Sequence, residues 1–264
     1  MSPTTARRPA SSSANDRSTF REHLEELRTR LLRVVAAVGV AFAVTYYFRS
    51  TLWAWVSLPL SKVIERQTPG TPAALSPFGF TDPAEPFLSG VRLALWAAAF
   101  VVAPVIFHQL WAFIGPGLLP SERRLAVPFV VVTSLCFLGG CAFAYFQAFA
   151  FLADILYREA VMLGLRANIH MGDYLDLFLG TVLMTGIMFE LPVLFYFLAK
   201  LRIVTAGWML KYWRHATVII VLFSAFFTPG DVVATTVFFS VVLLGLYFIS
   251  VFVVWIAQPT AHSS

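Results

Sequence analysis

Charged residues are scarce in this chain. Only 12% of its 264 residues are Asp, Glu, Lys or Arg, about half the share in an average soluble domain. Hydrophobic residues make up 59% of the chain, and the mean hydropathy is +0.78. This composition excludes a soluble globular protein, and the 26 phenylalanines suit helices that face lipid. The sequence therefore predicts an all-α, polytopic membrane protein.

Cysteine is nearly absent as well. Cys136 and Cys141 both lie in an apolar segment. Five residues apart on a helix, they point to different faces, which does not suit disulfide geometry. We interpret them as small packing residues. The five histidines are scattered without the spacing of metal ligands, so the sequence predicts neither a metal site nor a cofactor.

Sequence motifs of enzymes are missing too. The chain contains no HExxH, no GxSxG, no P-loop and no glycine-rich dinucleotide motif. Asp231, in "PGD", is the only hint of an intramembrane aspartyl site, and it has no obvious partner. We therefore predict that the chain is not an enzyme. It also lacks a basic patch with interleaved aromatic residues, so nucleic acid is not an expected partner.

Six apolar segments follow a polar start. Residues 1–18 are rich in Ser, Ala and Thr and are predicted to form a disordered cytoplasmic tail. About 20 residues are needed to cross the hydrocarbon of a bilayer. The candidate spans are 31–50, 90–114, 125–152, 174–199, 215–228 and 232–256. We predict a six-helix transmembrane domain over residues 19–257 with a short fifth helix, followed by a cytoplasmic tail, 258–264.

The distribution of Lys and Arg predicts the orientation. Thirteen of these residues fall before the first span and in the second-to-third and fourth-to-fifth connections, against five in the other connections. Because positive charge favours the cytoplasmic side, both termini are predicted to be inside. The connections 51–89 and 153–173 are then outside. Residues 52–67 fit an amphipathic interfacial helix, and a packed extracellular cap is the alternative interpretation for most of these residues.

A few acidic residues remain as candidates for function. Glu22, Glu25 and Glu26 share one face of a predicted helix, and Glu26 can pair with Arg30 one turn on. That pattern fits a helix that pairs its own charges, and it equally fits a carboxylate that faces a partner's guanidinium. Glu190 lies inside the fourth span, where a carboxylate costs roughly 2.5–3.5 kcal/mol unless it is solvated or paired.

Two interpretations of the other acids stay open on the residues alone. Glu190 is either a functional group or a structural hydrogen-bonding group, helped by the backbone group that Pro192 frees. Glu122, after Ser121, is either part of a site or an acid in the first turn of a helix.

Six motifs, in order, resemble the TatC family of twin-arginine protein translocases. The likeness covers residues 20 to 250. The motifs are "HLEELRTR" (23–30), "LPLSK" (58–62), "TDPAEPF" (81–87), "APVIFHQLWAFIGPGLLPSERR" (103–124), "FELPV" (189–193) and "FTPGDV" (227–232).

The resemblance implies a receptor for twin-arginine signal peptides in the bacterial cytoplasmic (inner) membrane. Such a receptor organises TatA- and TatB-type single-span subunits, forms homo-oligomers in the lipid bilayer, and exports folded proteins using the proton-motive force. By position, Glu26 and Glu122 match the two carboxylates associated with signal-peptide recognition. Neighbouring motif positions are matched by Arg28, Phe113 and Arg124, and other functionally sensitive positions by Pro59, Glu85, Glu190 and Asp231.

The chain departs from the family pattern in its last span. Thr235 and Phe248 stand where many members carry a glutamine and a glutamate, and this puts the docking of a TatA- or TatB-type partner there in doubt. The competing interpretation from another class is a proton-coupled transporter of small solutes that uses Glu190. A transporter would gather polar groups at mid-membrane depth, whereas Glu190 is nearly alone.

Overall fold

The computed structural model describes residues 12–67, 78–114, 126–165, 168–227 and 233–258, with the side chains of 12–23, 114, 126–127 and 227 left undescribed. The described chain is almost entirely helical, which confirms the predicted all-α class. The helices are α1 (Ser12–Tyr47), α2 (Arg49–Gln67), α3 (Glu85–Ile114), α5 (Ala126–Phe143), the π-helix η2 (Ala144–Ala148), α6 (Phe149–Met162), α7 (Met171–Met188), α8 (Leu191–Lys200), α9 (Ala206–Lys211), α10 (Trp213–Phe227) and α11 (Val233–Ala257). One short parallel pair joins β1 (Phe78–Gly79) to β2 (Ile169–His170).

Each predicted span coincides with helical structure. Four helical segments are long and apolar enough to cross a bilayer: Glu85–Phe113, Pro128–Met162, Met171–Lys200 and Val233–Ala257. The bent pair α1–α2 makes a fifth candidate. The predicted short fifth span is α10, whose 15 residues extend about 22 Å, less than the roughly 30 Å of hydrocarbon. The turn "TPGD" before α11 lies outside the described residues.

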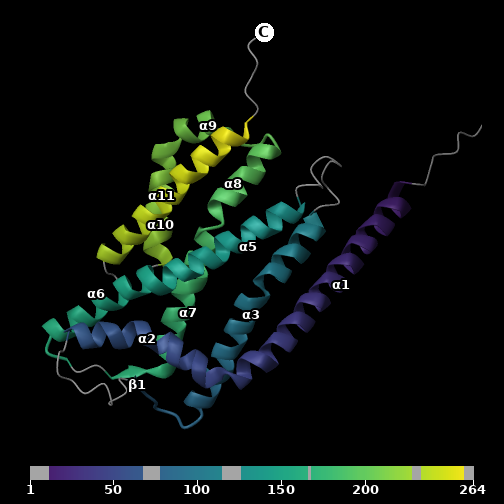
Figure 1. The fold of residues 1–264 in the computed structure, drawn as a ribbon. Helices are drawn as coiled ribbons and strands as arrows, with labels where there is room; N and C mark the ends of the chain where they lie inside the picture. Colours follow the sequence, from purple (N-terminus) through teal and green to yellow (C-terminus); the bar gives the residue numbers. More distant parts are fainter. Residues whose placement is uncertain (1–11, 68–77, 115–125, 166–167, 228–232, 259–264) are drawn as a thin grey trace, which may run out of the picture.

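The ends of the described chain lie at one end of the bundle. Figure 1 shows the first turn of α1 and the last turn of α11 at the same end, opposite to α2 and β1. This arrangement agrees with an even number of crossings. Which end faces the cytoplasm remains a prediction from the charge distribution. α1 begins at Ser12, within the segment predicted to be a tail.

The helix expected near 52–67 is present as α2. The chain bends by 79° between α1 and α2, so α2 runs across the end of the bundle rather than along it. One face of α2 is buried through Val56, Pro59, Leu60 and Val63, the spacing of an amphipathic helix. This face packs against α6 and α3.

Tyr174, at the start of α7, is the centre of the core beneath α2. Its ring is buried, and its hydroxyl donates to the backbone oxygen of Val56 at 2.5 Å. The surrounding rings of Trp53, Phe78 and Phe149 meet it edge to face, an arrangement that stabilises aromatic clusters. The end of the bundle that carries α2 is therefore held by a closely packed aromatic core.

Two glycines allow α5 and α7 to cross at close range. A Cβ atom placed on Gly140 would lie 2.9 Å from the Cα of Gly186, and a Cβ on Gly186 would lie 3.0 Å from the Sγ of Cys141. Small residues permit such close approach of helices in membranes. Cys141 and Cys136 are both free and half-buried, as their interpretation as packing residues requires.

Proline interrupts the fourth predicted span. α7 ends at Met188 and α8 begins at Leu191, with Pro192 in its first turn. Because Pro192 has no N–H, it cannot donate to the carbonyl of Met188, and the helical ladder is broken there. Glu190 therefore lies at a break between two helices rather than in a continuous helix.

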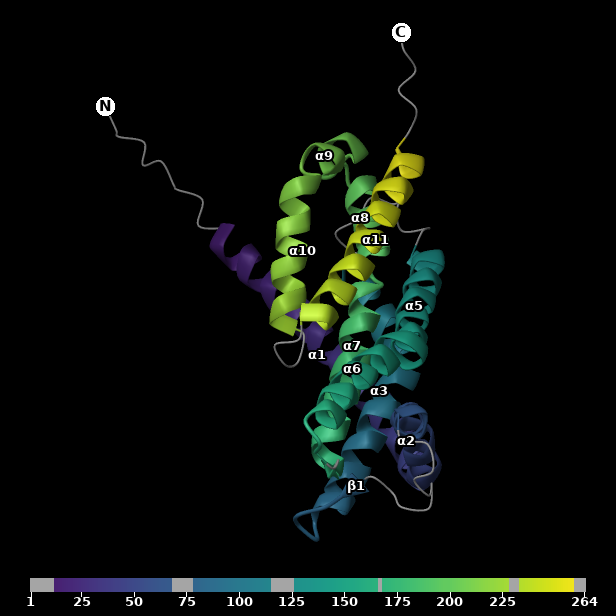
Figure 2. The same cartoon turned by 90° about the vertical axis from the view of Figure 1, so that its left-hand side faces the viewer.

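The remaining helices form a separate side of the bundle. Figure 2 shows α10 and α11 side by side, with α9 at the end of the molecule opposite to α2. α11 also packs along α8, and the Tyr247 hydroxyl donates to the backbone oxygen of Met209 at 2.8 Å. The short α10 is thus held against α11 and not against the α1–α3 side.

Candidate functional site

Glu26 lies in the part of α1 that precedes the predicted span. Its carboxylate accepts hydrogen bonds from Arg30, which confirms the predicted pair one turn apart. The Nε of Arg30 is 3.2 Å from Oε1, and a second guanidinium nitrogen contacts the same oxygen. A shallow surface hollow of about 360 Å³ surrounds them, lined by Glu25, Glu26, Thr29, Arg30 and Arg33. Both carboxylates and guanidinium groups are therefore accessible from one side.

A single hydrogen bond sets the level of Glu26 relative to α3. The Thr45 hydroxyl donates to the backbone oxygen of Ala94 at 2.8 Å, where α1 and α3 run antiparallel. Nineteen residues back along α1 stands Glu26, and nineteen residues forward along α3 stands Phe113. Both lie about 28 Å along their helices from this contact. The candidate carboxylate and the candidate aromatic residue thus belong to the same end of the bundle.

Glu122, Arg124 and Asp231 lie outside the described residues. Glu122 and Arg124 belong to the segment 115–125, which starts directly after α3 and ends directly before α5. The facing ends of α3 and α5 are joined by rings: Trp111 stacks on Phe129 with centroids 4.1 Å apart. The described ends of α3 and α5, between which this segment lies in the sequence, are therefore at the level of Phe113.

Arg28 and Phe113 differ in exposure. Arg28 is exposed on α1, and among the described residues it forms no ion pair. Phe113 is half-buried near the end of α3. Arg28 can therefore meet a partner from solution, while Phe113 is positioned to pack.

Pro59 and Glu85 belong to the opposite end of the molecule. Glu85 begins α3, and its carboxylate accepts from the backbone N–H groups of Thr81 at 3.0 Å and Gly172 at 2.9 Å. Near it, the Thr81 hydroxyl and the His170 Nδ1 are 3.0 Å apart. Glu85 thus joins the start of α3 to the start of α7. It does not meet Glu26.

Pro59 acts through the backbone of α2. A proline at position 59 has no N–H to donate to the carbonyl oxygen of Trp55. That oxygen instead accepts a hydrogen bond at 2.9 Å from the hydroxyl of Tyr145, in η2. The proline therefore frees an acceptor that ties α2 to the α5–α6 segment. Its role is structural support of the end of the bundle that carries α2.

Glu190 lies between the two ends. It is half-buried, and its Oε1 has no hydrogen-bond partner among the described residues. The helix break leaves the carbonyl oxygen of Met188 without the donor that residue 192 would supply in a continuous helix. The family-matched residues that the structure describes therefore fall into two groups at opposite ends, with Glu190 apart from both.

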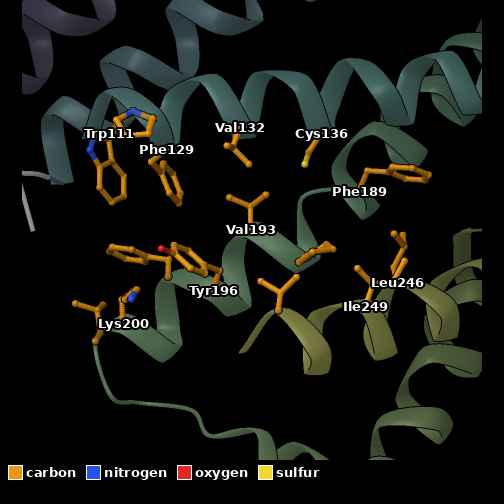
Figure 3. A pocket seen from close by; sticks show the side chains of 15 residues that line it. Trp111, Phe129, Val132, Cys136, Phe189, Val193, Tyr196, Lys200, Leu246 and Ile249 are labelled. Atoms are coloured by element: carbon orange, nitrogen blue, oxygen red, sulfur yellow. The ribbon is translucent and has the colours of Figure 1, made fainter. Parts of the chain in front are cut away.

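The sequence did not predict an apolar hollow that the structure contains. It has a volume of about 550 Å³ and lies between α3, α5, α8 and α11 (Figure 3). Its walls are apolar, with Lys200 near one end, where Nζ lies 5.5 Å from the centre of the Tyr196 ring. Its lining includes Trp111, Phe129, Cys136, Phe189, Val193 and Leu246. Because these residues are ordinary apolar residues on four segments, no local pattern marks them.

The two positions that depart from the family pattern have different environments. Thr235 is fully buried inside the chain, whereas Phe248 is exposed on α11. A side chain at 235 therefore faces its own protein, and only position 248 can meet a partner helix directly. Among the described residues, no group of three or more His, Cys, Asp or Glu is arranged to hold a metal ion.

Comparison with known proteins gives a consistent result. The family model "Sec-independent protein translocase protein (TatC)" matches residues 22–241. Two proteins named Sec-independent protein translocase protein TatC are similar to the chain. The protein from Helicobacter pylori (strain ATCC 700392 / 26695) is 35% identical over 242 residues, 91% of this chain and 88% of that protein. The protein from Koribacter versatilis (strain Ellin345) is 32% identical over 245 residues, 91% of this chain and 86% of that protein.

A solved structure agrees with the sequence comparisons. The crystal structure of a twin-arginine translocase receptor, TatC, superposes with a TM-score of 0.73 and 27% identity, covering 90% of this chain and 100% of the other. The family model covers most of the chain, and the relatives are matched over nearly their whole length. The chain is a multi-pass membrane protein and belongs to the TatC family of Sec-independent protein translocase proteins.

Proposed function

We propose that this chain is the twin-arginine signal-peptide receptor of a translocase that exports folded proteins across the bacterial cytoplasmic membrane. It performs no catalytic step, and the proton-motive force drives transport. TatA- and TatB-type single-span subunits assemble with it, together with further copies of the chain. The observation that carries the proposal is that Glu26 lies at the same end of the bundle as Phe113. In the sequence, Phe113 comes shortly before the segment that contains Glu122.

Carboxylates suit this task because of their geometry. A carboxylate can accept two parallel hydrogen bonds from one guanidinium group, which an ammonium group cannot reproduce. Two carboxylates, Glu26 and Glu122, would therefore take two consecutive arginines and discriminate against lysine. Arg30 is already bound to Glu26 within α1. An arginine of the peptide must then share the Glu26 carboxylate with Arg30 or displace Arg30 from it.

The charges alone supply little affinity. Exposed ion pairs are each worth about 0–1 kcal/mol, so two of them do not hold a peptide at low concentration. The apolar part of a signal peptide supplies the rest by lying against apolar helix surface. The hollow between α3, α5, α8 and α11 offers such a surface next to Trp111.

Photo-crosslinking tests the proposal directly. A synthetic twin-arginine signal peptide is expected to crosslink to photoreactive residues placed beside Glu26 and Glu122, and a twin-lysine peptide to crosslink at least tenfold less. Glu26→Gln and Glu122→Gln should each reduce the crosslinks. Glu25→Gln is the matched control, since Glu25 lies next to Glu26 and is exposed. Equal crosslinking of both peptides, or undiminished export in the double variant, would refute the proposal.

The environment of Glu190 favours a second candidate function, proton-coupled transport of a small solute. Its carboxylate is half-buried, with one oxygen unpartnered among the described residues, which is the environment of a proton-coupled site. Transport of a small solute would then require this group. A Glu190→Gln variant whose proton uptake in proteoliposomes equals that of the wild type would remove this alternative.

A further inference from the structure

A second groove lies at the end of the molecule that carries α2. It runs between α2 and the η2–α6 segment, which pack against each other, and has a volume of about 230 Å³. Its walls are Leu58, Pro59, Lys62, Val63 and Arg66 from α2, and Tyr145, Phe146 and Ala150 from the other side. No step of the proposed function uses this groove, and its role is independent of that function.

Two cations stand on one edge of the groove. Lys62 and Arg66 are one helical turn apart, so their side chains project from the same face of α2. Both are exposed, and neither forms an ion pair within 4.0 Å among the described residues. The segment 68–77, which follows α2, contains no acidic residue in its sequence.

The neighbouring acids neutralise this edge only in part. Asp154 on α6 binds the Gln67 amide at 2.7 Å and the Arg158 guanidinium at 2.7 Å, and the charge of Arg66 also helps to lower the pKa of its carboxyl group. Glu65 is the remaining acid on α2 close to the pair. The groove therefore combines an apolar floor with a net positive rim.

The length of the third predicted span indicates where the groove lies relative to the bilayer. The apolar helical segment Pro128–Met162 has 35 residues and extends about 50 Å, well beyond the roughly 30 Å of hydrocarbon. Counted from Pro128, about twenty residues reach Ala148. If the hydrocarbon begins at Pro128, we expect Tyr145 and Phe146 near its opposite edge and Lys62 and Arg66, which line the same groove, close to the lipid headgroups.

Exposed aromatic residues support a position of the groove near the membrane–water interface. Trp55 is 62% exposed, as expected for a ring in the interfacial belt of a membrane protein, and Phe146, 69% exposed, suits contact with lipid. The Tyr145 hydroxyl is fixed on the Trp55 carbonyl, so its ring is held as one wall of the groove. The groove is thus a formed feature of the interface between α2 and η2.

We propose that this groove binds one anionic phospholipid of the leaflet on the α2 side, predicted to be the outer one. The phosphate lies between Lys62 and Arg66, and an acyl chain follows Leu58, Phe146 and Ala150 toward the bilayer. The size of the groove favours an extended chain, because pockets for compact ligands measure about 300–1,000 Å³. The cationic rim favours an anionic headgroup over a zwitterionic one.

Photolabelling with defined lipids tests the proposal. The full-length protein is placed in nanodiscs that contain a photoactivatable phosphatidylglycerol, or a photoactivatable phosphatidylcholine with the same chains, and the adducts are mapped by mass spectrometry. We expect phosphatidylglycerol to label residues 58–66 and 145–150 at least threefold more than phosphatidylcholine. Lys62→Gln with Arg66→Gln should reduce this labelling to the phosphatidylcholine level.

Two variants control for folding and charge. Lys62→Arg with Arg66→Lys keeps both charges and should retain the labelling. Lys211→Gln with Arg214→Gln removes the same charge at the other end of the molecule and should leave the adducts at 58–66 and 145–150 unchanged. Each variant is accepted for comparison when it elutes as a single peak on size exclusion.

Several outcomes would overturn the proposal. Equal labelling by both lipids, or undiminished labelling in the Lys62→Gln, Arg66→Gln variant, would mean apolar lipid contact without headgroup recognition. Displacement of the label by millimolar inorganic phosphate would indicate a free-phosphate site. Crosslinks between α2 of one copy and α6 of another, in place of lipid adducts, would indicate an interface between copies. Signal-peptide crosslinking at Glu26 is independent of all these outcomes.

Discussion

The hydroxyl of Tyr145 donates a hydrogen bond at 2.9 Å to the backbone oxygen of Trp55, 90 residues earlier in the chain. This oxygen is the one that Pro59 leaves without its helical donor. A proline inside a helix is costly because it removes a backbone hydrogen bond. Here the lost bond is replaced by one that joins α2 to η2. The pair gives a physical reason for a proline in the "LPLSK" motif.

Pro59 and Tyr145 should be energetically coupled. Tyr145→Phe removes the donor to Trp55 and is expected to lower the free energy of unfolding by about 1 kcal/mol. Pro59→Ala restores a backbone N–H that can bond to Trp55, so Tyr145→Phe should cost much less in that background. A double-mutant cycle, measured by reversible denaturation in detergent, gives the coupling energy.

Tyr157→Phe is the control for this cycle, because the Tyr157 hydroxyl takes no part in the hydrogen bond between Tyr145 and Trp55. Its effect should be the same with proline or alanine at position 59. Additive effects of Tyr145→Phe and Pro59→Ala would show that the two residues act independently.

The crossing of α5 and α7 should tolerate no added methyl group. Gly140→Ala would place a Cβ 2.9 Å from the backbone of Gly186, and backbone cannot move aside as a side chain can. We expect a loss of about 1–3 kcal/mol in unfolding free energy. Gly186→Ala should also destabilise, since its Cβ would lie 2.8 Å from the Phe137 ring.

Gly139 provides a matched control for that prediction. It is adjacent in sequence to Gly140, but a Cβ there would meet nothing within 4 Å. Gly139→Ala should be neutral or stabilise by up to about 1 kcal/mol, because alanine favours helix over glycine. Similar melting temperatures for the Gly139→Ala and Gly140→Ala proteins would contradict the close crossing.

Removal of the Glu85 carboxylate should loosen the junction between α3 and α7. Glu85→Ala leaves the N–H groups of Thr81 and Gly172 without their acceptor. Amide hydrogen exchange is expected to rise at least fivefold in residues 79–82 and 170–173, while the exchange of α8 and α11 stays unchanged. Glu65→Ala, an exposed acid on α2, should leave both regions as in the wild type. Uniform exchange changes along the chain would instead indicate global destabilisation.

Arg30 should act as a weak competitor for Glu26. An ion pair one turn apart on a helix contributes about 0.3–0.5 kcal/mol, so its loss changes peptide affinity little. Arg30→Gln is expected to alter the dissociation constant of a twin-arginine peptide by less than threefold, in the direction of tighter binding. Glu26→Gln should weaken binding by up to about fivefold, the most that an exposed ion pair of about 1 kcal/mol supplies. Calorimetric or fluorescence titration measures both, and equal losses in the two variants would assign Arg30 a direct role in binding.

Much of the fold was predictable because its signals are local. The six apolar segments coincide with helices, and α2 appears where an amphipathic segment was expected, since both follow from hydrophobic runs and their periodicity. The Glu26–Arg30 pair was predictable for the same reason, because it spans one helical turn. The family motifs are local as well, and the comparisons confirm the resemblance that they carry.

The relations between distant segments were not predictable in this way. The Trp55–Tyr145 bond, the Glu85–Gly172 bond and the apolar hollow between α3, α5, α8 and α11 each join segments separated by dozens of residues. Glu85 and Pro59 could be named from motifs, but neither motif indicates what the residue contacts.

The sequence by itself determined that this chain is a helical membrane protein of the TatC family, because composition, hydrophobic runs and ordered motifs act over short stretches of chain. Tertiary structure alone decided which residues meet. It placed Glu26 level with Phe113 through the Thr45–Ala94 contact, put Pro59 and Glu85 at the opposite end, and opened the groove beside Lys62 and Arg66. Packing between helices sets such relations, and packing depends on shapes that only the folded chain brings together.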